Sequence, residues 1–174
     1  MSRLLIVVDM QKDFIDGALG TSEAVAIVPN VVKKIEAHEG VVIYTRDTHT
    51  EDYLNTQEGQ KLPVVHCVKE TDGWRINEEV AKAGVTKDVI VIDKPSFGSV
   101  ELGDVVKRLH AEGKADEIEL IGLCTDICVI SNAMIVKANL PEVPMYVDGS
   151  CCAGVTPASH DNALAAMRMC QITC

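Results

Sequence analysis

Five short runs of aliphatic, mostly β-branched residues recur along the chain, and segments with helical patterns separate most of them. These runs are apolar almost throughout, which is typical of parallel strands that are buried on both faces. Strands that alternate with helices build an open, doubly wound sheet. The sequence therefore predicts a three-layer, Rossmann-like α/β fold of five to six mainly parallel strands with helices on both faces. The runs are residues 3–9 (RLLIVVD), 41–46 (VVIYTR), 88–93 (DVIVID), 117–122 (EIELIG) and 143–148 (VPMYVD).

The predicted helices are recognised by apolar spacing and by the residues at their ends. One covers residues 29–40, with a proline near its start and a glycine at its end. Others cover residues 99–113, a segment that begins near Thr125, and residues 157–169. The C-terminal residues CQITC are expected to add a short edge strand. Because 174 residues without linkers or repeats suit a single core, we expect one domain over residues 1–174.

Charge and hydropathy exclude several classes of protein. The formal net charge of −10 opposes nucleic-acid binding, which needs clustered Lys and Arg. No apolar stretch approaches the roughly 20 residues that cross a bilayer, and Asp9 comes too early for an export signal. Seven cysteines cannot all pair within one chain, and the cysteines of proteins that are not exported normally stay reduced. We therefore expect a cytoplasmic protein with free thiols and with neither membrane nor nucleic acid as a partner.

Ionisable side chains follow four of the predicted strands. In open parallel sheets ligands bind beyond the carboxyl ends of the strands, and all of these positions fall at that edge. A random scatter would place as many ionisable residues at the opposite edge, so their convergence indicates a functional site. The residues are Asp9 after the first strand, Asp47 and His49 after the second, Lys94 after the third, and Cys124 and Cys128 after the fourth.

Cys124 and Cys128 leave several interpretations open: a metal pair, a redox pair, two buried small hydrophobes, or one nucleophile. Cys128 lies in the first turn of a predicted helix, where the helix dipole and a nearby Lys94 would favour a thiolate. Asp9 could accept the thiol proton, and backbone N–H groups at the helix start could hold an oxyanion. Cys124 precedes the helix and is the weaker candidate. A free cysteine taken alone is usually a small buried hydrophobe, so the nucleophile hypothesis depends on the whole set.

Four segments match one known family in order and spacing. The segments are VVDMQKDF (7–14), DKPSFGS (93–99), GLCTDICV (122–129) and DGSCCAGVTPASHDNAL (148–164). Through them, and over essentially the whole chain, the sequence resembles the isochorismatase-like cysteine hydrolases, and among them most of all the nicotinamidases. The resemblance implies that Asp9, Lys94 and Cys128 form a catalytic triad. It also implies a cis peptide bond before Cys124 and an oxyanion hole made by the N–H groups of Cys124 and Cys128.

The resemblance to nicotinamidases further implies a divalent metal ion beside the triad. Asp47 and His49 would point the same way from an extended segment, because side chains alternate along a strand. Glu58 and His66 match the spacing of the remaining ligands and lie in a long irregular segment, residues 47–73. Two imidazoles with two carboxylates suit Zn, Mn or Fe, and Zn is the ion that we expect.

The implied substrate pocket consists of Phe14, Leu62 and Phe97, and the sequence departs from the family pattern around it. Pro63 stands where nicotinamidases usually have an aromatic residue, and Glu70 stands where many have glycine. The implied reaction converts nicotinamide to nicotinate and ammonia through a cysteine thioester. We therefore expect a homo-oligomeric enzyme of NAD metabolism whose partner is a small carboxamide substrate.

Three alternatives stay open. The first is another small-amide or ureido hydrolase of the same family. The second is isochorismatase itself, although hydrolysis of a vinyl ether needs neither the cysteine nor the metal ligands. The third is a non-catalytic binding protein or thiol sensor, which the intact set of Asp9, Lys94 and Cys128 opposes.

Overall fold

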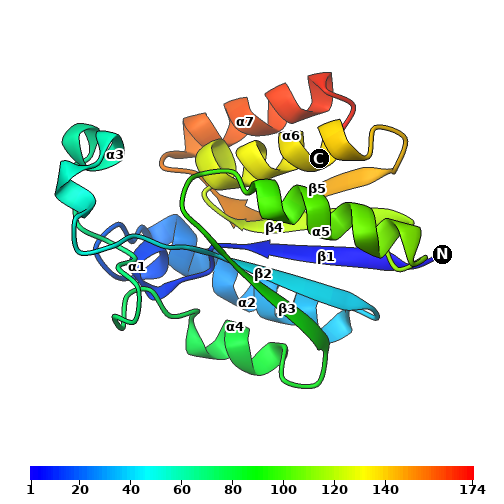
Figure 1. Cartoon of the computed structure of the whole chain (residues 1–174), viewed down its shortest axis with the longest axis horizontal. Helices are drawn as coiled ribbons and strands as arrows, with labels where there is room; N and C mark the ends of the chain where they lie inside the picture. The colour runs from blue at the N-terminus through cyan, green and yellow to red at the C-terminus, as the bar shows by residue number, and fades with distance from the viewer.

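The computed structural model describes residues 1–174, and its centre is a five-stranded sheet with helices on both faces (Figure 1). The strand order is β3-β2-β1-β4-β5, and every neighbouring pair is parallel. The predicted open α/β fold is confirmed. The residues CQITC contribute only an isolated bridge, between Thr173 and Tyr146, and no sixth strand. The strands are β1 (Arg3–Val8), β2 (Val41–Asp47), β3 (Asp88–Lys94), β4 (Glu117–Leu123) and β5 (Met145–Ala153).

The helices form two layers around this sheet. Buried residues of α5, α6 and α7 pack on one face, and those of α1, α2 and α4 pack on the other. No helix is both long enough and apolar enough to cross a membrane. The helices are α1 (Lys12–Ile15), α2 (Ser22–Ala37), α3 (Gln57–Lys61), α4 (Glu78–Ala83), α5 (Val100–Ala111), α6 (Ile130–Asn139) and α7 (Pro157–Met169), with a 3-10 turn at Tyr53–Asn55 and a π-helical turn at Thr125–Val129.

Strand β1 shows why the predicted strands read as continuous apolar runs. Leu4 and Ile6 point into the core under α5 and α6, whereas Leu5 and Val7 point into the core against α2. All four side chains are completely buried, because both faces of the sheet are covered. Burying one aliphatic side chain of this size contributes about 1.5–3 kcal/mol, so the central strand anchors both helical layers.

Helix α2 begins earlier than the sequence predicts. Thr21 caps it by accepting a hydrogen bond from the Ala24 N–H at 3.0 Å, and Pro29 lies inside the helix and not at its start. The predicted start at residue 29 is therefore wrong. Buried residues at helical spacing occur on both sides of the proline, from Ala24 to Ile35. Packing of this stripe against the sheet offsets the cost of an internal proline, about 3 kcal/mol.

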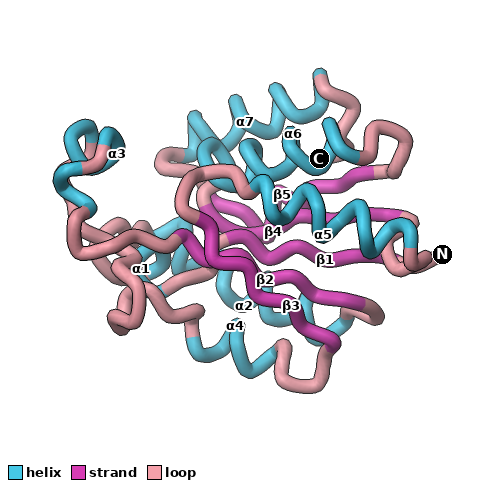
Figure 2. Tube along the Cα trace, viewed as in Figure 1, coloured by secondary structure: helices cyan, strands magenta, loops and turns pink.

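The strand order reverses between β1 and β4. The connections that follow these two strands leave toward opposite faces of the sheet, which makes this edge a topological switch point. Gly122 in β4 has a φ of 117°, and a Cβ there would collide with the backbone of Val8 in β1. A glycine therefore allows the two strand ends to approach closely at this point. The tube in Figure 2 shows long loops gathered at this carboxyl edge, and residues 47–73 with the short α3 extend from it.

Candidate active site

Three buried side chains meet at the carboxyl edge of the sheet, just beyond the strands that carry them. Asp9 follows β1, Lys94 is the last residue of β3, and Cys128 lies in the π-helical turn after β4. The Lys94 Nζ lies 2.6 Å from Asp9 Oδ2 and 3.4 Å from Cys128 Sγ. Asp9 and Lys94 are completely buried, and Cys128 is nearly so. The ammonium group therefore lies between a carboxyl group and a thiol, as the strand ends predict.

Thr45, a buried residue of β2, holds the Asp9 carboxyl group in place. The Thr45 hydroxyl donates a hydrogen bond to Asp9 Oδ1 at 2.7 Å, and the Asp9 N–H donates to the Thr45 side chain at 3.2 Å. Asp9 has a left-handed backbone conformation, with a φ of 47°, which aspartate tolerates better than most residues. Its second oxygen, Oδ2, lies 2.6 Å from Lys94 Nζ, so Thr45 holds one oxygen of the carboxyl group and Lys94 pairs with the other.

Burial governs the protonation of this cluster. It raises the pKa of the Cys128 thiol well above its ordinary value, and Asp9 adds to the rise although Lys94 opposes it. Burial also raises the pKa of Asp9, against the lowering effect of Lys94. Burial lowers the pKa of Lys94, but Asp9, Cys128 and Asp47 outweigh it and hold that pKa above its usual range. The resting thiol therefore keeps its proton, in contrast to the thiolate expected from its position at a helix start, and Asp9 is a stronger base than an exposed carboxylate.

Cys124 has a different environment from Cys128. The Leu123–Cys124 peptide bond is cis, as the family resemblance implies. The Cys124 carbonyl accepts hydrogen bonds from the N–H groups of Ile127 (3.1 Å) and Val129 (3.0 Å), so it closes the turn around the other cysteine. Burial raises the pKa of the Cys124 thiol to about 12. The two thiols differ in their contacts: Cys128 Sγ lies 3.4 Å from Lys94 Nζ, whereas the Cys124 thiol makes no hydrogen bond to Lys94 or Asp9.

Asp47, His49, Glu58 and His66 form a second cluster beside the first. One ligand atom from each of the four lies within 4.8 Å of all the others. The Nε2 atoms of His49 and His66 lie 2.9 Å and 3.6 Å from Asp47 Oδ2, and each lies 3.7 Å from Glu58 Oε1. The Lys94 Nζ lies 3.5 Å from Asp47 Oδ1 and so joins the two clusters. All four residues predicted as metal ligands are brought together.

The chemistry of this cluster fits a divalent metal ion. Two buried atoms, Asp47 Oδ1 and His49 Nε2, have no hydrogen-bond partner, although such atoms rarely lack one. The His66 Nδ1 contacts the Val64 carbonyl at 2.8 Å, which directs its Nε2 to the centre of the cluster. Burial favours a neutral Asp47, but His49, His66 and Lys94 hold the pKa of Asp47 well below its usual range. An ionised carboxylate and two oriented imidazoles are ligands that Zn, Mn and Fe accept.

Two residues that the sequence did not single out support the metal cluster. Tyr53 is completely buried, and its ring centroid lies 4.6 Å from that of His49 and 5.0 Å from that of His66. Buried Gln11 accepts a hydrogen bond from the Asp47 N–H at 2.7 Å and donates one to the Asp47 carbonyl at 2.9 Å. The segment 47–73 is therefore held by packing and hydrogen bonds and is not a loose loop.

A cavity of about 70 Å³ connects the two clusters. Phe14, Leu62 and Phe97, the residues predicted for the substrate pocket, all line it. The sequence did not identify Leu19 and Ile127, which add further apolar surface. The remaining lining residues are Asp47, Glu58, His66, Cys124 and Cys128. A small, mostly apolar cavity with a thiol and metal-ligating groups on its walls is suited to a small ligand.

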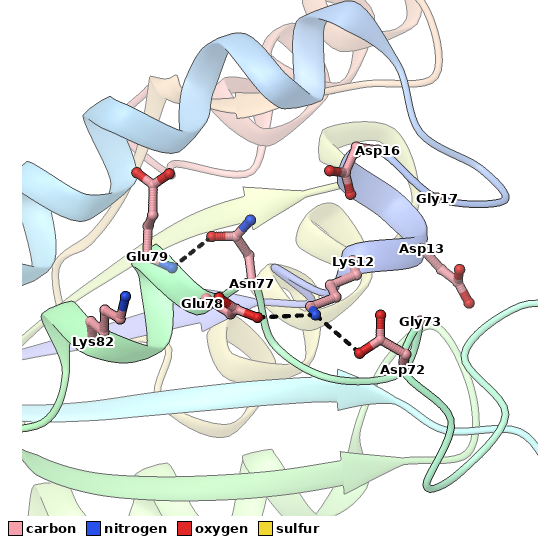
Figure 3. Close-up of a pocket in the computed structure, with 10 residues that line it drawn as sticks. All are labelled: Lys12, Asp13, Asp16, Gly17, Asp72, Gly73, Asn77, Glu78, Glu79 and Lys82. Atoms are coloured by element: carbon pink, nitrogen blue, oxygen red, sulfur yellow. Dashed lines mark hydrogen bonds and ion pairs between the residues drawn. The ribbon is translucent and has the colours of Figure 1, made fainter.

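A larger cavity, about 570 Å³, lies elsewhere, between α1 and α4 (Figure 3). No hydrophobic residue lines it, and Lys12 crosses it to reach Asp72 at 3.0 Å and Glu78 at 3.4 Å. Figure 3 shows Asp72 and Glu78 directed at Lys12, whereas the other charged side chains of this surface point in different directions. None of the residues of the two clusters lines this cavity, so its size alone does not make it the functional site.

Comparison with known proteins agrees with this geometry. The family model described as the isochorismatase domain matches residues 3–174. The chain belongs to the isochorismatase domain family. The chain is 24% identical over 177 residues to the nicotinamidase of Saccharomyces cerevisiae, covering 76% of this chain and 80% of that protein.

Solved structures of isochorismatase-like proteins have the same fold. The pyrazinamidase/nicotinamidase of Streptococcus mutans UA159 is 27% identical, covers 99% of both chains and superposes with a TM-score of 0.82. The pyrazinamidase of Pyrococcus horikoshii, solved in complex with zinc, is 26% identical, covers 99% of this chain and 98% of that chain, and gives a TM-score of 0.80. The predicted resemblance to this family, and within it to the nicotinamidases, is confirmed.

Proposed function

We propose that this chain is a metal-dependent amidohydrolase that converts nicotinamide to nicotinate and ammonia. One observation carries the proposal: Cys128, whose Sγ lies beside the Lys94–Asp9 ion pair, lines the same small cavity as three of the four clustered metal-ligand candidates, Asp47, Glu58 and His66. A nucleophile, a base and a charge-stabilising group are the elements that acyl transfer requires. The similarity to nicotinamidases and pyrazinamidases supports carboxamides as the substrate class.

In the first half of the proposed reaction, Cys128 forms a thioester. Asp9 accepts the thiol proton as Cys128 Sγ attacks the carboxamide carbon, and the carbonyl oxygen becomes an oxyanion. The N–H groups of Cys124 and Cys128 stabilise this oxyanion. Asp9 then returns the proton to the amide nitrogen, the C–N bond breaks, and ammonia leaves. Lys94, which stays protonated beside both residues, keeps the cluster's charge balanced in each step.

In the second half, water hydrolyses the thioester. Asp9 accepts a proton from the attacking water and returns it to the sulfur as the C–S bond breaks, so the carboxylic acid is released and the thiol of Cys128 and the carboxylate of Asp9 are restored. Lowering the thiol pKa permanently is unnecessary in this scheme, because the thiolate forms only as its proton moves to Asp9.

Asp47, His49, Glu58 and His66 would hold the metal ion. When bound, a divalent ion would supply Lewis acidity and an anchoring point for a ring nitrogen at the end of the cavity. Phe14 and Phe97 would contact the faces or edges of the ring, and aromatic contacts of this kind contribute about 0.5–1.5 kcal/mol each. Leu62, beside Pro63, takes the place of an aromatic wall, which weakens ring binding without removing the slot.

The metal content of the purified protein is the first test. Protein prepared without chelator is expected to contain about one transition-metal ion per chain, as four converging ligands imply. His49→Ala should lose that ion, whereas His110→Ala should retain it, because His110 contacts the Ala115 carbonyl far from the cluster. Elemental analysis of the three proteins decides the matter. Full amidase activity in protein stripped of metal would contradict the metal-dependent proposal.

The substrate is tested by comparing three amides at fixed metal loading. Nicotinamide and pyrazinamide should be hydrolysed, and benzamide, which lacks the ring nitrogen, at least about tenfold less efficiently, because a site built for a polar group discriminates against analogues without it. The measurement is kcat/KM from ammonia release. A ratio near one for nicotinamide over benzamide would mean that the site does not recognise the ring nitrogen. The proposal would then become a broader small-amide hydrolase.

A further inference from the structure

Asn132 is a completely buried amide on α6, one helical turn beyond Cys128, and no step of the proposed reaction uses it. Its Nδ2 donates hydrogen bonds to the carbonyl oxygens of Phe97, at 3.0 Å, and Cys128, at 2.8 Å. Its Oδ1 accepts a hydrogen bond from the Ser99 N–H at 2.9 Å. Both amide hydrogens and the amide oxygen are engaged, so one planar group joins the nucleophile turn to residues 95–99.

Residues 95–99 connect β3 to α5 and lie against α6. The Ser96 carbonyl accepts a hydrogen bond from Lys94 Nζ at 3.1 Å, which ties one part of this segment to the catalytic cluster. Gly98 approaches α6 so closely that a Cβ would lie 2.6 Å from Ile135 Cδ1. Asn132 ties the rest of the segment to the same helix, so the segment has little freedom to move relative to Cys128.

This segment carries Phe97, one wall of the cavity that Cys128 also lines. The Phe97 side chain is 44% exposed, so burial alone holds its ring only weakly. The position of the ring therefore depends on its backbone, and the Phe97 carbonyl is fixed by Asn132. The same amide fixes the Cys128 carbonyl, so the spacing between the cavity wall and the nucleophile is set through one side chain.

We propose that Asn132 is a positioning residue that sets the spacing between Phe97 and Cys128 and thereby shapes the cavity for a flat ring. The inference rests on the proposed function, because the ring concerned is that of the carboxamide substrate. Asn132 acts through Phe97 and does not itself touch the reacting atoms. Its effect should therefore appear in substrate binding and ring selectivity more than in the chemical step.

The test compares Asn132→Ser with a matched control, Asn139→Ser. A serine at position 132 can still bond the Cys128 carbonyl four residues earlier, but it is too short to bridge to residues 95–99. Asn139 lies on the same helix and donates to the Ile135 carbonyl at 2.9 Å, yet it makes no hydrogen bond to the Phe97 segment. Asn132→Ser should raise KM for nicotinamide about three- to tenfold, the range of one lost aromatic contact, with kcat changed by less than about twofold. Asn139→Ser should change neither.

A double-mutant cycle with Phe97→Ala identifies the route of the effect. Without the ring there is nothing to position, so adding Asn132→Ser to Phe97→Ala should raise KM by less than about twofold more. If the KM increases of the two single variants multiply in the double variant, or if Asn132→Ser lowers only kcat, the proposal is overturned. Asn132 would then only support the nucleophile turn. If Asn132→Ser does not fold, Asn132→Thr takes its place, because it fills more of the volume and also cannot reach Phe97.

Hydrogen exchange separates this inference from the proposed function. The Ser99 amide, whose N–H donates to Asn132 Oδ1, should exchange at least about tenfold faster in Asn132→Ser than in the wild type or Asn139→Ser, because the segment has lost its tether. This measurement needs no substrate. If the wild type hydrolyses none of the amides, the proposed function fails and exchange alone decides the role of Asn132. Unchanged exchange at the Ser99 amide would overturn that role even in an active enzyme.

Discussion

Cys128→Ala should abolish carboxamide hydrolysis and leave a folded protein. The substitution removes only the sulfur atom, and the loss of a covalent nucleophile typically costs at least about 10³-fold in kcat. The neighbouring ion pair between Lys94 and Asp9, 2.6 Å long, does not depend on the thiol, so the buried charges remain compensated. This variant should therefore release no ammonia from nicotinamide, while its circular dichroism spectrum stays the same as that of the wild type.

Cys124→Ala is the matched control, because the proposed role of Cys124 belongs to its backbone N–H and not to its thiol. It should retain much of the activity. Mass spectrometry of wild-type enzyme quenched in acid during turnover of nicotinamide should also find an acyl adduct on the peptide that contains Cys128. An adduct on Cys124 or Cys151, or an active Cys128→Ala enzyme, would show that the nucleophile is misassigned.

The fold and the grouping of Asp9, Lys94 and Cys128 could be predicted from patterns that are local in sequence, whereas the metal-ligand set with Glu58 and His66 was implied only by the family resemblance. Continuous apolar strands such as residues 3–9 have one stable arrangement, with both faces covered. Side chains that follow such strands converge at one edge whatever the loops do, and this is why Asp9, Lys94 and Cys128 could be grouped before any geometry was known.

The features that the sequence did not indicate depend on tertiary contacts. Pro29 normally marks a helix start, but the buried stripe of α2 continues through it. Tyr53, Gln11 and Asn132 act through buried hydrogen bonds or ring packing with residues of other segments. The spacing of apolar residues in a sequence does not reveal such contacts. The rise in the pKa of the Cys128 thiol was not foreseen either, because the helix dipole can be inferred from sequence position whereas burial of the sulfur cannot.

Lys94→Met should destabilise the protein strongly as well as inactivate it. Lys94 is completely buried, and its Nζ lies near Asp9, Cys128 and Asp47. Removing the ammonium leaves Asp9 buried without its counter-charge, a change that typically costs about 3–5 kcal/mol. Methionine keeps most of the volume, so the loss cannot be assigned to a cavity. Urea denaturation at neutral pH should show the lower free energy of unfolding, and ammonia release should show the loss of activity.

Two controls separate charge compensation from general fragility. Lys107 pairs with Asp104 at 3.0 Å on the exposed surface of α5, so Lys107→Met should hardly change stability or activity. Adding Asp9→Asn to Lys94→Met removes both buried charges and should restore part of the lost stability while the enzyme stays inactive. Stability would recover because no uncompensated carboxylate remains next to β1, and activity would not because the base is gone. If the double variant is as unstable as the sum of the two single variants, Lys94 and Asp9 are not energetically coupled, and the proposed charge balance in the cluster is incorrect.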